Sequence, residues 1–212
     1  YMCMIMAVFA IFIVTTFVSN VILRDDESGF GPIIQATRLS KFDYLFGRFT
    51  GAFVTSCLVF LSVPLAMMVS LILPGIDPET VGAFRIGTYV YVYLALCVPT
   101  LFVLSASFFA LATTTRSMLT TYVVALSLLM VYLLTARYIN RPEWVGIVAL
   151  LDPFGLSALA RAIVNWTAAE RNVLFPPIAG PMLQNRILWC SVAVVLLALT
   201  WRNFSNQRGS ET

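Results

Sequence analysis

The sequence contains no histidine, a single lysine (Lys41) and few charged residues of either sign, which make up 11% of its 212 residues. Without histidine, the chain cannot build a His-ligated zinc site, a Ser-His-Asp triad or a Cys-His pair. A net charge of +3 scattered along the chain is too small for nucleic-acid binding. A phosphate-binding loop needs Gly-Lys-Ser/Thr, and Lys41 follows Ser40. We therefore expect no bound cofactor, metal or ATP and no catalytic residue on this chain.

Cysteine is also scarce, and its four occurrences have no chemical pattern. Each cysteine lies inside an apolar run far from the others, and no pair has the spacing of a metal site or a redox motif. We interpret all four as small apolar packing residues; they are Cys3, Cys57, Cys97 and Cys190.

Hydrophobic residues, in contrast, make up 60% of the chain. They fall in long uninterrupted runs that a single water-soluble core could not hide. The sequence therefore predicts an all-α membrane protein, a single transmembrane helix bundle over residues 1–212. Its five predicted spans cover residues 2–22, 49–73, 88–115, 117–136 and 183–201.

Two prolines and one arginine lead to further predictions about the shape and the ends of the spans. Pro64 and Pro99 each lie within a span, and we expect kinks there because neighbouring helices satisfy the freed carbonyl. The last apolar run is short, so we expect it to gain a turn from residues 182–186, with Arg186 snorkelling to the headgroups.

The orientation follows from the arginines and the lysine. With residues 24–48 on the cytoplasmic side, seven of these residues lie inside and six lie outside. The outside count is spread over a segment of about fifty residues, and long segments translocate largely regardless of charge. The count therefore favours a cytoplasmic position for residues 24–48.

Residues 24–48 form the most polar connection. It opens with Asp25-Asp26-Glu27, and Pro32 then precedes a stretch that suits the first turn of a helix. Ser40 with Asp43 three residues later fits a capping box, so a new helix is expected to start at Ser40. The segment is predicted to be a short helix across the membrane face, followed by an elbow. The acidic cluster is either a solvated face or a docking surface for a soluble partner.

Residues 137–186 contain two apolar stretches that are too short to span a membrane. They are separated by Asp152-Pro153, and in the second stretch apolar residues recur at helical spacing while Arg161 lies on the opposite side. We predict two short re-entrant or interfacial helices over residues 143–166. Asp152 is interpreted as an N-cap with Pro153 at the first helical position.

Several other functions conflict with the charges of the spans. No acidic or basic residue lies near the centre of a span, which disfavours an ion-coupled carrier. An aspartyl intramembrane protease needs two facing carboxylates, and no second acid lies in a span. Backbone carbonyls alone could still bind sodium.

Six segments carry a family resemblance. They are residues 24–29 (RDDESG), 36–49 (ATRLSKFDYLFGRF), 74–78 (PGIDP) with 109–117 (FALATTTRS), 151–155 (LDPFG) and 185–189 (NRILW). Together they resemble the membrane-spanning subunit of ABC-2 type transporters. The later segments are most similar to bacterial permeases that are fused to a zinc aminopeptidase domain. The family has six spans, and because Tyr1 opens on an apolar run without a start methionine, we expect the chain to be a piece lacking the first span.

This resemblance implies a permease of an ATP-driven exporter in the bacterial inner (plasma) membrane, surrounded by lipid. A separate ABC ATP-binding subunit and a second permease copy or half would be its partners. Residues 24–48 would be the coupling loop and Gly47 its hinge, where the loop turns into the second span. Residues of the outer gate would be Asp152, Pro153, Phe154 and Gly155. Residues docking the ATPase would be Glu27, Ser28, Gly29, Gln35, Thr37 and Arg38.

Two alternatives remain at this point. The first is a membrane anchor or scaffold that transports nothing and holds a fused or associated aminopeptidase domain at the bilayer. The second is an intramembrane enzyme, which the missing histidines and acids disfavour. The substrate, and whether the two permease units are identical, are not encoded in any pattern of the sequence.

Overall fold

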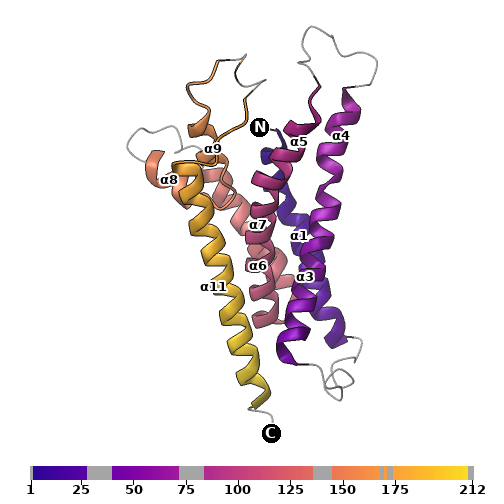
Figure 1. Cartoon of the computed structure of the whole chain (residues 1–212). Coiled ribbons are helices and arrows are strands. Elements are labelled where there is room, and N and C mark those ends of the chain that lie inside the picture. The colour runs from indigo at the N-terminus through magenta and orange to yellow at the C-terminus, as the bar shows by residue number, and fades with distance from the viewer. Residues whose placement is uncertain are drawn as a thin grey trace.

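The computed structural model of the chain describes residues 2–27, 40–71, 84–135, 145–167, 170 and 174–209, and these residues form helices without any strand (Figure 1). The elements are α1 (Met2–Glu27), α3 (Lys41–Phe60), α4 (Ser62–Ser70), α5 (Ile86–Tyr91), the π-helix η2 (Val92–Cys97), α6 (Val98–Thr115), α7 (Met118–Thr135), α8 (Val145–Leu151), α9 (Leu156–Ala162) and α11 (Pro181–Gly209). The predicted all-α fold is confirmed for this part of the chain.

Four of the described helical segments are long and apolar enough to cross a membrane. They are Met2–Arg24, Lys41–Ser70, Ile86–Thr115 and Pro181–Phe204. The other predicted span, residues 117–136, is α7. Its apolar part, Met118–Leu134, is shorter than the other four. Its roughly 26 Å falls a few ångströms short of a hydrocarbon core.

The helices are irregular beside both prolines, where kinks were predicted. Pro64 has no N–H for the carbonyl four residues earlier, and a turn at Leu61 separates α3 from α4. Pro99 is the second residue of α6, and the wider π-helical turn of η2 directly precedes it. Such π turns are frequent at functional sites.

The helices α1 and α6 form the centre of the bundle. α1 packs against α3, α6, α7 and η2, and α6 also packs against α3 and α11. Fully buried residues recur on one face of α1 at helical spacing: Ala7, Ile11, Val14 and Val18. The outer surfaces of α7 and α11, by contrast, expose large apolar side chains such as Leu119 and Val194. Exposed apolar surface of this kind fits contact with lipid or another membrane helix.

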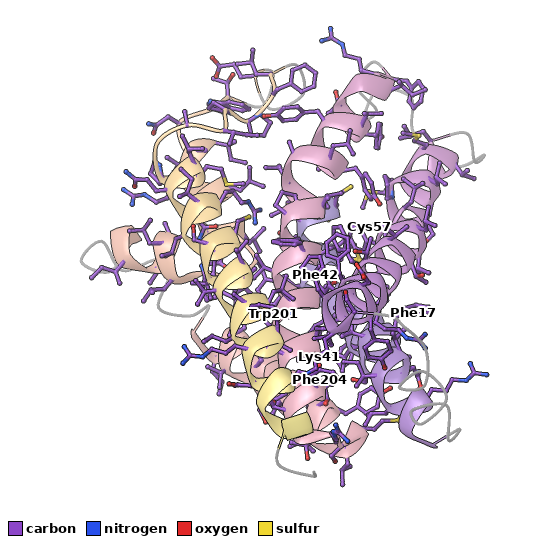
Figure 2. The ribbon with its side chains drawn as sticks, turned by 60° about the horizontal axis from the view of Figure 1, so that its bottom comes forward. Phe17, Lys41, Phe42, Cys57, Trp201 and Phe204 are labelled. Carbon is purple, nitrogen blue, oxygen red and sulfur yellow. The ribbon has the colours of Figure 1, made fainter. Side chains whose placement is uncertain are left out.

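Aromatic rings join the described helices near the N-terminus of α3. Phe49 packs edge-on against Phe109 of α6 at 5.4 Å between ring centroids. Tyr44 stacks on Phe204 of α11 at 6.2 Å. Phe42 of α3 and Trp201 of α11 line one small hollow at this end, and Figure 2 labels both residues together with Phe204. The first turns of α3 are therefore held against the last turns of α11.

The predicted helix start at Ser40 is confirmed. The Ser40 hydroxyl accepts a hydrogen bond from the Asp43 backbone N–H at 3.1 Å, and α3 begins at Lys41. The second span therefore starts earlier than residue 49. Gly47 lies inside α3 in ordinary helical backbone, so this helix begins at Lys41 and not at Gly47. A hinge at Gly47 stays a prediction about motion.

Candidate functional site

The residues predicted to dock an ATPase fall almost entirely outside the described residues. Glu27 is the last residue of α1. Residues 28–39, which include Ser28, Gly29, Gln35, Thr37 and Arg38, are not described. The surrounding structure does establish that α1 and α3, which flank this loop, pack directly against each other.

The predicted outer-gate residues, in contrast, lie at the best-defined polar site of the bundle. Asp152 follows α8, is 5% exposed, and accepts hydrogen bonds from the backbone N–H groups of Phe154 at 2.9 Å and Ser157 at 2.7 Å. Ser157 lies in the first turn of α9, so Asp152 satisfies a free donor of that helix. The prediction that Asp152 is the N-cap with Pro153 at the first helical position is wrong, because α9 begins at Leu156 and Gly155 directly precedes it.

Side chains from the start of α11 satisfy the end of α8. The Asn185 amide donates to the carbonyls of Ala149 at 2.8 Å, Leu150 at 3.1 Å and Asp152 at 2.8 Å. The Trp189 indole N–H donates to the Leu150 carbonyl at 3.0 Å. The last carbonyls of a helix lack hydrogen-bond donors within that helix. Asn185 and Trp189 of α11 supply these donors to the end of α8.

Arg186 lies at the centre of the same site. Its guanidinium donates to the Thr100 hydroxyl at 3.0 Å, the Leu96 carbonyl at 3.2 Å and the Phe154 carbonyl at 3.2 Å. Its side chain therefore joins α11 to η2, to α6 and to the turn between α8 and α9. We call the set Thr100, Asp152–Gly155, Asn185, Arg186 and Trp189 the Arg186 junction.

A glycine makes room for the guanidinium. Gly155 has φ +74°, a conformation that side chains with a Cβ rarely adopt. A Cβ atom at this position would lie 2.7 Å from Nη2 and 2.9 Å from Cζ of Arg186. Both the backbone angle and the close approach therefore require glycine here.

The charge of Arg186 is balanced mainly by neutral oxygens. No carboxylate within the described residues forms an ion pair with it, although the charge of Asp152 acts on it electrostatically. Three buried polar atoms of the site have no hydrogen-bond partner among the described residues: Arg186 Nε, Asn185 Oδ1 and Ser157 Oγ. Each such group costs about 1–3 kcal/mol when left unsatisfied. A buried ionisable residue in a span is expensive and is a functional candidate for that reason.

The position of Arg186 corrects the sequence prediction that it snorkels to the headgroups. The residue is only 6% exposed, because Leu96, Thr100 and Phe154 offer acceptors inside the bundle. The sequence argument considered only the position of Arg186 near a helix end. The adjacent Asn185, a second polar residue in the same apolar run, was the signal that this end of α11 faces protein.

No group of three or more His, Cys, Asp or Glu side chains that could hold a metal ion occurs within the described part of the chain. The hydrogen bonds of the Arg186 junction connect the helix pair α8–α9, the start of α11 and the helix η2–α6 to one another.

No protein-family model matches this chain, and no curated protein sequence matches it.

Proposed function

We propose that this chain is the transmembrane domain of an ATP-driven exporter of the ABC-2 type. It would work with a separate ATP-binding subunit and a second permease unit in a bacterial inner membrane. The observation that carries the proposal is that two segments of the family resemblance, residues 151–155 and 185–189, meet in the Arg186 junction. The buried arginine between these two segments indicates that they share a role.

The arrangement of the bundle supports the same proposal. The α8–α9 pair lies at one end, and the facing ends of α1 and α3 lie at the other (Figure 1). α1 contacts α3 and α6, and α6 contacts α11. A push on the polar loop between α1 and α3 would therefore reach the Arg186 junction through directly packed helices.

In this mechanism the junction is the outer gate in its closed arrangement. Moving α6 away from α11 would separate Arg186 from Leu96 and Thr100, while Asn185 would keep α8 attached to α11. The unpartnered Nε and Oδ1 atoms give the junction spare hydrogen-bonding capacity for a second arrangement. ATP binding by the partner would supply the free energy for the change.

The test is co-purification of the full-length protein with the ATP-binding subunit encoded beside it. We expect the native protein to retain the ATPase and the double variant E27A/R38A to lose it, with at least a tenfold drop in recovered ATPase. The matched control is R85A/E170A, which also removes one acid and one arginine but at exposed positions away from residues 24–48.

The outcomes separate the two functions. Loss with E27A/R38A and retention with R85A/E170A supports a coupling loop and an exporter. If no ATPase binds even the native protein, the exporter proposal fails and the membrane anchor for a peptidase domain replaces it. Equal loss with both variants would refute the loop residues as the docking surface.

A further inference from the structure

A cavity of about 420 Å³ lies beside the Arg186 junction, between α5–η2, α9 and residues 174–176. Its volume falls within the range of small-molecule sites. The cavity adjoins the polar junction at Leu96, whose carbonyl accepts a hydrogen bond from Arg186, and its other lining residues take no part in the junction. The residues that line it are mostly apolar, although polar atoms form part of its surface; they are Thr88, Val92, Leu96, Leu159, Ala160, Ile163, Val164, Trp166, Leu174 and Pro176.

The cavity extends along the first part of the candidate span Ile86–Thr115 towards the Arg186 junction. Its inner end is at Leu96, whose carbonyl is bound by Arg186. Its outer end is at Thr88, two residues after the span begins at Ile86. The eight-residue step from Thr88 to Leu96 corresponds to a length on the order of 10 Å along the helix. The outer wall is fixed in place, because the Tyr91 hydroxyl donates to the Pro176 carbonyl at 2.6 Å and the Tyr91 ring packs on Phe175.

Two polar groups of the lining have no hydrogen-bond partner among the described residues. They are the hydroxyl of Thr88 and the indole N–H of Trp166, both of which are half-buried. An indole N–H usually finds an acceptor when it is buried. An apolar slot with two donors therefore fits a ligand that has a hydrocarbon body and an oxygen acceptor.

We propose that this cavity binds the single hydrocarbon chain of a membrane amphiphile whose carboxylate accepts hydrogen bonds from Thr88 and Trp166. A ligand group the size of a water molecule, such as a methylene, occupies roughly 30 Å³. The cavity therefore has room for about fourteen groups of this size. That is room for one chain of medium length and too little for the two chains of a phospholipid. Such a chain would enter from the surrounding bilayer, because the cavity lies beside the first residues of a candidate span.

The proposal goes beyond export, because binding at this cavity needs no ATPase. The experiment uses the full-length protein in nanodiscs and a photoreactive dodecanoic acid with a diazirine on its chain. Cross-linked peptides are mapped by mass spectrometry. Competitors are plain dodecanoic acid, dodecanol and a two-chain phosphatidylglycerol.

We expect cross-links within residues 84–96 and 156–166, with competition by dodecanoic acid and not by the phospholipid. A160W, which fills the cavity, should lower this labelling at least tenfold. V131W is the control, because it adds the same bulk on the exposed surface of α7. If A160W does not fold, T88V/W166F carries the test, since it removes both donors and should raise the competing concentration of dodecanoic acid about tenfold.

Cross-links spread evenly over the lipid-facing helices would overturn the proposal, because they would show only surrounding lipid. Unchanged labelling in both A160W and T88V/W166F would also overturn it. Dodecanol competing as well as dodecanoic acid would refute the carboxylate. None of these results bears on ATPase binding, so the proposed export function and the cavity proposal fail separately.

Discussion

Replacing Gly155 with alanine tests whether the Arg186 junction stabilises the bundle. The substitution has two costs that the structure separates. The first is backbone strain, because φ is +74° at Gly155 and a left-handed conformation costs about 1–2 kcal/mol for a residue with a Cβ. The second is a collision, because the new Cβ would lie 2.7 Å from Arg186 Nη2. The guanidinium must then leave its acceptors.

Three hydrogen bonds are at stake in that displacement. At the average of about 0.6 kcal/mol for interhelical hydrogen bonds in bilayers, they contribute about 2 kcal/mol. We therefore expect G155A to lower the free energy of unfolding by about 3–4 kcal/mol. G180A is the matched control, since Gly180 also has positive φ (+54°) but nothing lies within 4 Å of the added Cβ. It should cost only the strain of about 1–2 kcal/mol.

The assay is reversible unfolding in mixed detergent micelles, followed by tryptophan fluorescence for both variants. A double-mutant cycle with R186M isolates the collision, because methionine can bend away without losing hydrogen bonds. We expect a coupling free energy of about 2 kcal/mol between the two positions. Equal destabilisation by G155A and G180A would refute the argument that the Arg186 contact, rather than the backbone angle, makes glycine necessary.

Three further predictions follow from other contacts. R186M should destabilise the bundle by about 2 kcal/mol and increase hydrogen exchange in residues 149–155, whereas R202M, which changes an exposed arginine of the same helix, should not. S40A should cost about 1 kcal/mol, the usual loss for an N-cap, measured by micelle unfolding against the exposed mid-helix variant T55A. The backbone N–H and hydroxyl of Thr167 hold the pKa of the Glu170 carboxyl below its ordinary value. This capping interaction is therefore present above the ordinary pKa of a glutamate and is lost as the pH falls through the lowered pKa of Glu170. A carbon-13 NMR titration should show that the pKa of Glu170 is higher in T167V than in the native protein. An unchanged pKa would contradict the assignment.

Much of the fold could be predicted because a segment that crosses a bilayer must be a long apolar helix, and such segments can be recognised from composition alone. Apolar runs long enough to cross the hydrocarbon core identified the helices at residues 2–22, 88–115 and 183–201 to within a few residues at most ends, since no polar backbone group can be left unsatisfied there. The Ser40 cap and the helix irregularities beside Pro64 and Pro99 could also be predicted, because they depend only on neighbouring residues. Each depends on hydrogen bonds within four residues, so each is encoded in adjacent letters.

The Arg186 junction could not be predicted in this way. The predicted capping by Asp152 was right in kind, because its partners are only two to five residues away, and wrong in position, because α9 begins at Leu156 rather than at Pro153. The acceptors of Arg186 lie 32, 86 and 90 residues away, and no periodicity of α11 points to them.

By itself, then, the sequence determined that this chain is a bundle of apolar helices with a capped second span and two short helices near its last span. Only the tertiary structure decided that Arg186 is buried rather than exposed to headgroups. The cost of burying a cation depends on which carbonyls and hydroxyls surround it. Those groups come from η2, α6 and the α8–α9 turn, which meet only after the helices have packed.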